Sequence, residues 1–217
     1  MKSKIVSQIR RHERLRSRGL NLIASENYLS PRVRQALAGD LAGRYHTQWY
    51  GGSRFAREII ETTEALARRL FKTKHALVTP LSGNICDLTV LFAFTAPKDK
   101  VAMVPLDAGG YPLGVEKFDR KLVFLPTHSE TYDLDLPATR KLIANQKVNL
   151  VVLGASFILF PHPVKEISEW IRNYGGSSHC VYDGSHVLGL IACGQFQDPL
   201  REGAEVLFGS THKSLYG

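Results

Sequence analysis

Apolar positions along the chain fall into two alternating patterns: short continuous runs, and stripes with a spacing of three or four residues. Continuous runs rich in Val, Ile and Leu predict strands, at 75–80, 100–106, 121–126, 148–156, 179–183 and 204–210. Helical spacing predicts helices, at 5–19, 53–71, 82–94, 134–146 and 163–176. Ser53 is a suitable N-cap for the second helix, Pro137 lies near the start of the fourth, and Gly19 ends the first.

The alternation of buried strands with helices predicts an α/β fold with a mostly parallel sheet covered by helices on both faces. In such sheets, ligand sites gather beyond the carboxyl ends of the strands. The residues that directly follow each strand are therefore the first place to look for chemistry.

Charge divides the chain into two parts. The net charge is +8, and seven basic residues against one acidic residue give residues 1–20 a charge of +6. We expect 1–20 to form a basic helical arm and 21–217 to form one large domain. The arm has no interleaved aromatic residues, so we expect a solvated face rather than a nucleic-acid site.

Composition favours a protein of the reducing cytoplasm. The three cysteines are widely spaced, which argues against a disulfide framework and against a metal site. The longest apolar stretch, 150–160, is too short to span a membrane. No apolar segment follows the basic N-terminus, so we expect no secretory signal.

The predicted strand ends carry a varied set of functional groups. The segments that follow the strands include a hydroxyl, a helix start, an aromatic ring, a carboxylate, an imidazole and an amine. These segments are Ser82-Gly83-Asn84, Gly109-Gly110-Tyr111, Ser156, Asp183-Gly184-Ser185-His186 and Ser210-Thr211-His212-Lys213. Each is ordinary by itself, as a cap, a turn or a surface residue. Together they suit pyridoxal phosphate, which needs a lysine amine, a carboxylate for its ring nitrogen, and N–H groups for its phosphate.

The sequence resembles the serine hydroxymethyltransferase family of fold-type I pyridoxal-phosphate enzymes. The resemblance lies in "NLIASENYLSPRVRQAL", "YGG" at 50–52, "LSGN" at 81–84, "LGAS" at 153–156, "VYDGSHVLGLIACG" at 181–194 and "STHKSLYG" at 210–217. It implies interconversion of serine and glycine with tetrahydrofolate as one-carbon acceptor, and a homodimer. It also implies that the chain is the large domain without the C-terminal small domain.

The resemblance assigns roles by position. Lys213 would form the Schiff base beside His212, Asp183 would face the ring nitrogen, and His186 and Ser156 would approach the phenolic oxygen. Tyr111 would stack on the ring. Ser82, Gly83 and Asn84 would hold the phosphate. Ser25 and Tyr50 would approach the amino acid carboxylate, and Tyr45 would lie close to the Schiff base.

Three positions depart from the family pattern. Tyr111 stands where the family usually has a histidine, and Asn84 ends a block that usually reads Ser-Gly-Ser. Between Tyr45 and Tyr50 only "HTQW" is present, whereas the family has a longer segment with a glutamate. His46 is the other group there suited to proton transfer near neutral pH.

Two further functions remain open from the sequence. A folate-independent aldolase of β-hydroxy amino acids would fit the missing acid. An inactive fragment that serves as an interaction module would fit the short chain.

Overall fold

A computed structural model describes residues 3–47, 52–174 and 177–216. Its centre is a five-stranded, wholly parallel sheet in the order β2-β1-β3-β4-β5. The strands are β1 (Lys100–Met103), β2 (Lys121–Phe124), β3 (Leu150–Leu153), β4 (His179–Asp183) and β5 (Val206–Phe208). The mostly parallel sheet predicted from the sequence is therefore confirmed.

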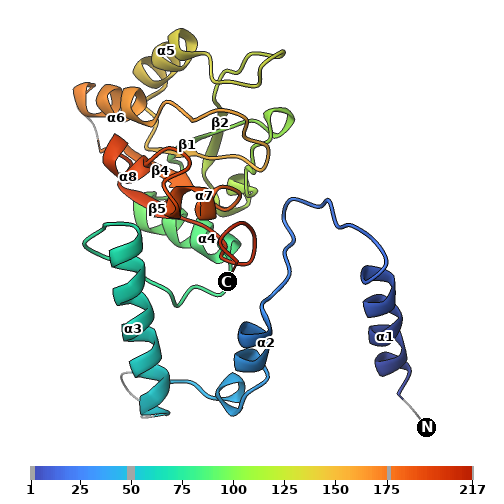
Figure 1. The fold of residues 1–217 in the computed structure, drawn as a ribbon. Coiled ribbons are helices and arrows are strands. Elements are labelled where there is room, and N and C mark those ends of the chain that lie inside the picture. Colours follow the sequence, from blue (N-terminus) through green and yellow to red (C-terminus); the bar gives the residue numbers. More distant parts are fainter. Residues whose placement is uncertain (1–2, 48–51, 175–176, 217) are drawn as a thin grey trace.

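Helices surround this sheet and extend from it (Figure 1). The α-helices are α1 (Lys4–Arg16), α2 (Pro31–Leu37), α3 (Arg54–Leu70), α4 (Gly83–Phe94), α5 (Leu136–Gln146), α6 (Val164–Asn173), α7 (Leu188–Ala192) and α8 (Pro199–Glu202). Short 3-10 turns are η1 (Asp40–Gly43), η2 (Leu106–Ala108) and η3 (Val115–Phe118).

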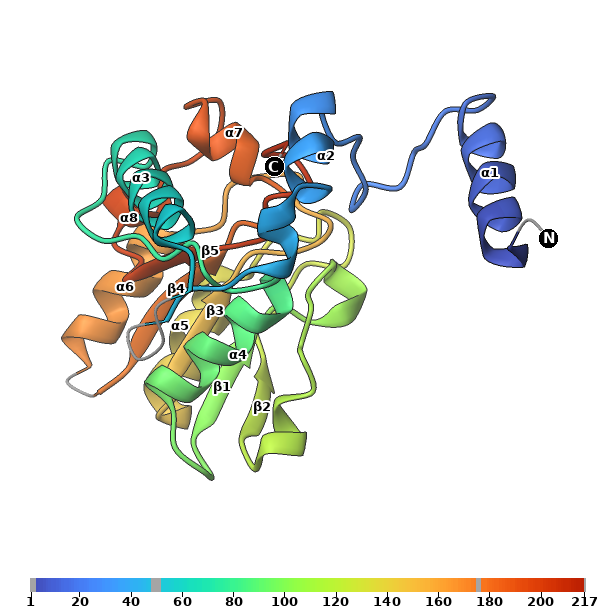
Figure 2. The same cartoon turned by 90° about the horizontal axis from the view of Figure 1, so that it is seen from below.

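Both faces of the sheet are covered, as predicted (Figure 2). Successive strand residues point to opposite faces. Val181 belongs to the apolar cluster under α4, and the next residue, Tyr182, belongs to the cluster under α5 and α6. Burial of these two layers is the main source of stability.

Side-chain caps set the starts of α3, α4 and α5. The Ser53 side chain accepts from the backbone N–H of Ala56, so the predicted N-cap of α3 is confirmed. Ser82 caps α4 in the same way and Asp135 caps α5. These caps satisfy N–H groups that a helix start leaves without partners.

Two expectations were wrong. Residues 75–80 form no strand in the structure, and Leu77 there is 77% exposed. A strand needs a hydrogen-bonded neighbour, and no described residue pairs with this segment. The first helix ends at Arg16 rather than at Gly19, because the chain turns at Ser17.

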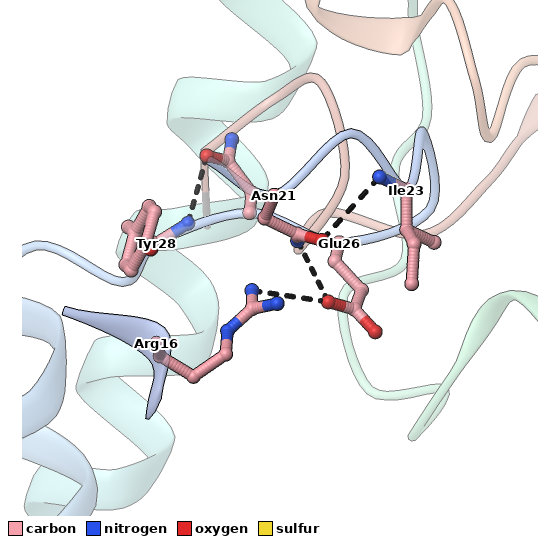
Figure 3. A network of polar contacts seen from close by, with 6 residues as sticks. Arg16, Asn21, Ile23, Glu26 and Tyr28 are labelled. Carbon is pink, nitrogen blue, oxygen red and sulfur yellow. Dashed lines mark hydrogen bonds and ion pairs between the residues drawn. The ribbon is translucent and has the colours of Figure 1, made fainter. Parts of the chain in front are cut away.

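The basic arm stands apart from the sheet in both views (Figures 1 and 2). A small polar network joins the end of α1 to the segment that follows it (Figure 3). The Glu26 carboxylate accepts from Asn21 at 2.7 Å and from Arg16 at 3.2 Å. These contacts fix the path of the chain as it leaves the arm.

Helix α3 presents a stripe of exposed apolar side chains. Phe55, Ile59, Leu66 and Leu70 on this helix are exposed by 49–57%. Among the described residues, no helix has the length and apolar character needed to cross a membrane.

Candidate functional site

The carboxyl ends of β4 and β5 bring the Asp183 and Lys213 segments together. Asp183 is the last residue of β4, and strand alternation places its side chain on the α4 face, like that of Val181. The backbone N–H of Ser185 donates to Asp183 Oδ1 at 2.9 Å. The half-buried carboxylate is thus held at the edge of the sheet where ligands are expected.

Lys213 and His186 are in direct contact. Lys213 Nζ lies 3.2 Å from His186 Nε2, and both side chains are half-buried. Burial lowers the pKa of His186, the charge of Lys213 lowers it further, and Asp183 opposes both. The imidazole is therefore neutral near pH 7, which leaves a ring nitrogen able to accept a proton or a hydrogen bond.

Two contacts hold the loop that carries Lys213. The Asn27 side chain donates to the Lys213 carbonyl at 2.7 Å, across 186 positions of sequence. On the other side, the Gly189 N–H donates to Ser214 Oγ at 3.1 Å. A Cβ at Gly189 would lie 2.0 Å from the Ser214 carbonyl oxygen, so α7 packs on this loop only because the residue is glycine.

The N-terminus of α4 meets the same edge of the sheet. A Cβ at Gly83 would lie 3.1 Å from Ser185 Oγ and 3.3 Å from the Ser210 backbone nitrogen. The Ser210 N–H donates to Ser185 Oγ at 3.1 Å. Ser210 Oγ is buried and has no hydrogen-bond partner among the described residues. The N-terminus of a helix with an unpaired hydroxyl group beside it is well suited to bind an anionic group.

The predicted stacking residue lies next to this helix start. The Tyr111 hydroxyl donates to Asn84 Oδ1 at 3.4 Å, and the ring is 51% exposed. Ser156 follows β3, and its N–H donates to the Gly109 carbonyl at 2.7 Å. The loops after β1 and β3 are thereby joined at the site.

Three other predicted residues make none of these contacts. Tyr45 lines a separate cavity of about 450 Å³ together with Asp40, Arg44 and others, none of them from the Lys213 loop. Ser25 is half-buried in the turn two residues before Asn27. His212 is exposed. Tyr50 lies outside the described residues.

Sequence reasoning missed the buried group that supports the loop after β3. His162 Nδ1 accepts from the Gly154 N–H at 3.0 Å, and the Gln197 side chain bonds the backbone of His162 in both directions. Gly154 has a φ of +102°, and a Cβ there would lie 2.0 Å from the Asp183 carbonyl oxygen. His162 therefore fixes the turn that touches the end of β4.

Asn27, Ser210 and Asp87 were also missed. Ser210 stood in a quoted strand-end block without a role, and Asn27 stood in a quoted family block. Asp87 carried a visible signal: it is the one acid on the otherwise apolar face of α4, four residues after Gly83.

Comparison with known proteins identifies the family. The family model for serine hydroxymethyltransferase matches residues 1–217. The chain belongs to the serine hydroxymethyltransferase family. Its curated relatives include serine hydroxymethyltransferases of Picrophilus torridus (40% identity, 95% of this chain and 49% of the relative) and Methanothermobacter thermautotrophicus (40%, 99% and 52%). The chain thus spans about half the length of the curated relatives it matches.

A solved structure supports the family fold. The L-threonine transaldolase of Pseudomonas fluorescens matches with a TM-score of 0.86 over 96% of this chain and 50% of that chain, at 24% identity. At this identity the likeness establishes the fold, which is the expected fold-type I large domain.

The donor set of the site fits pyridoxal phosphate. The buried, unpaired Ser210 hydroxyl lies beside the start of α4, where a phosphate has N–H groups to accept from. A carboxylate and an amine follow on neighbouring strand ends.

Proposed function

We propose that this chain is the cofactor-binding part of a serine hydroxymethyltransferase, which interconverts serine and glycine with tetrahydrofolate. The observation that carries the proposal is the contact between Lys213 Nζ and His186 Nε2 at the carboxyl ends of β4 and β5, beside Asp183. Membership of the family supports the reaction class.

The proposed roles follow from the positions of the groups. Lys213 would hold the aldehyde of pyridoxal phosphate, and Asp183 would hold the proton on its ring nitrogen by a charge-assisted contact. Ser82, Gly83, Asn84 and Ser210 would bind the phosphate, and Tyr111 would cover the ring. When bound, the cofactor supplies an electron sink for charge that develops on the amino acid.

His186 would hold or move a proton beside the lysine. Its lowered pKa keeps the imidazole neutral, so Nε2 can accept a hydrogen bond from Lys213 Nζ. Ser156 and His212 remain proposed neighbours of the cofactor, from the family resemblance. Ser25, Tyr45 and Tyr50 would contact the amino acid substrate.

The assembly is proposed as a cytoplasmic homodimer. The exposed apolar stripe of α3, together with Leu20 and Leu22 at 92% and 89% exposure, supports burial of these surfaces by a second copy. The separate position of Tyr45 is consistent with a site completed by residues of two copies.

A second candidate is a folate-independent aldolase of β-hydroxy amino acids. The observation that favours it is the segment between Tyr45 and Tyr50, which contains no acid. A positioned acid or base is typically worth about 10²–10⁴-fold in rate. We therefore expect slow folate-dependent cleavage of serine and retained cleavage of allo-threonine without folate.

The experiment compares these two rates in a chain completed to the length of its relatives. Absorbance is measured first, because a visible band of lysine-bound cofactor would support an enzyme. Absence of this band would favour the inactive interaction module. With the band present, fast and strictly folate-dependent serine turnover would reject the aldolase, and the variant His46→Gln would then test whether His46 replaces the missing acid.

A further inference from the structure

Asp87 is a carboxyl group in an apolar setting. It lies on α4, is 8% exposed, and lines a small space of about 10 Å³. The other lining residues are all apolar, and they include Met103, Val152 and Phe208. No hydrogen bond to the Asp87 side chain occurs among the described residues, and the influences on its charge are burial, Asp183 and Lys213, so a negative charge there has no direct partner.

Asp87 shares its face of the sheet with the candidate site. Gly83, one turn earlier on α4, touches Ser185 and Ser210, and Asp183 points to the same face. The charged groups that act on Asp87 are Asp183 at the end of β4 and Lys213 in the following loop. Cys86 is its neighbour on the helix, and burial and the charges of both carboxyl groups raise the pKa of the Cys86 thiol.

Burial raises the pKa of Asp87 to about 8, the charge of Asp183 raises it too, and Lys213 opposes the rise. This direction agrees with the geometry, since an isolated carboxylate in an apolar pocket near a second carboxylate is unfavourable. At neutral pH the group therefore carries its proton.

We propose that Asp87 is a positioning residue that holds a proton beside Asp183 and so leaves Asp183 as the single negative charge under the candidate cofactor site. Loss of that proton in mild alkali places a second negative charge near Lys213. The inference rests on the proposed function for its meaning, but the proton itself is a property of the chain without cofactor.

Infrared spectroscopy tests the proton directly. In the cofactor-free chain labelled with ¹³C-aspartate, a protonated-carboxyl C=O band is expected at about pH 6 and is lost at about pH 10. The band is expected to be absent from Asp87→Asn. In Asp183→Asn it is expected to titrate at lower pH, because the repelling charge is gone. Wild type without a band at about pH 6 would overturn the proposal even if neither variant folds.

The stability of the cofactor-free chain gives a second readout. A raised carboxyl pKa means that the folded chain binds the proton more tightly than the unfolded chain, so wild type loses stability as pH rises from about 4 to about 8. The denaturation midpoint of Asp87→Asn relative to wild type is expected to increase across this range. Asp107→Asn, an exposed control, should track wild type. Parallel pH profiles for Asp87→Asn and wild type would overturn the proposal.

These measurements separate the proposal from the proposed function. Failure of the chain to take up pyridoxal phosphate would count against the function and leave the infrared and stability results unchanged. Uptake of the cofactor with no protonated carboxyl would retain the function and reject the role of Asp87.

Discussion

At the scale of single residues, Asp183 combines a fixed position with an accessible charge. Ser185 holds one carboxylate oxygen and strand β4 sets its direction. We expect Asp183→Asn to keep this shape but to lose the charge that holds a proton on the ring nitrogen. Turnover in the completed chain should fall by at least about 10²-fold. Unchanged turnover, with Asp107→Asn as the matched control, would refute the role.

His162 is expected to make the stability of the chain fall as pH falls, which is the opposite of the effect expected for Asp87. Burial lowers the pKa of His162 from 6.5 to about 4, and the charge of Asp133 opposes this shift. The neutral ring accepts a hydrogen bond from the Gly154 N–H. A lowered histidine pKa means that stability is present above pH 6.5 and is lost as pH falls toward about 4. The loss attributable to this group is about 3 kcal/mol.

The variant His162→Asn isolates this effect. An amide oxygen can still accept from Gly154, but it does not titrate. We expect its denaturation midpoint to fall less than that of wild type between about pH 6.5 and about pH 4. Equal acid sensitivity of the two proteins would show that His162 is not the responsible group.

At the scale of elements, α4 is fixed at both ends. Its start meets Ser185 and Ser210, and its end is held by the buried Arg120. The Arg120 guanidinium donates to the Thr95 hydroxyl, the Thr95 carbonyl and the Phe118 carbonyl at 2.6–3.0 Å. The position of the candidate phosphate site therefore depends on an arginine at the far end of the helix.

Arg120→Ala should lower the free energy of unfolding by about 3 kcal/mol, because two carbonyls lose a charged donor. Arg120→Lys should be intermediate, since an ammonium cannot reproduce the forked geometry. Arg69→Ala removes an exposed arginine and serves as control. Denaturant unfolding measures all three, and an Arg120→Ala protein as stable as the control would contradict this account of α4.

The apolar pattern predicted those strands and helices that form because their apolar residues are buried. Strands β1, β3 and β4 were predicted because their Val and Leu runs are buried on both faces, and the partly buried β2 and β5 were predicted from the same apolar pattern. Residues 75–80 have the same pattern but no strand beside them, and the pattern alone does not identify a missing partner. Short helices such as α7 and α8 were missed because four or five residues carry no periodicity.

At the scale of the whole molecule, the candidate site is built from segments that are distant in sequence. Asn27, near the start of the domain, donates a hydrogen bond to the Lys213 carbonyl. Helix α4 and strand β4, from the middle of the chain, meet at the same site. The strand-end rule predicted that Asp183, His186 and Lys213 would meet. It could not predict Asn27 or Asp87, because neither follows a strand and their roles depend on the packing of other elements.

The central claim is that Lys213 holds pyridoxal phosphate. The most direct measurement is to incubate the chain with the cofactor, reduce it with borohydride, and map the modified peptide by mass spectrometry. The account predicts one modified lysine, Lys213, with the modification lost in Lys213→Ala and retained in Lys165→Ala, which removes an exposed lysine. Modification of a different lysine, or a trapped cofactor in Lys213→Ala, would contradict the account.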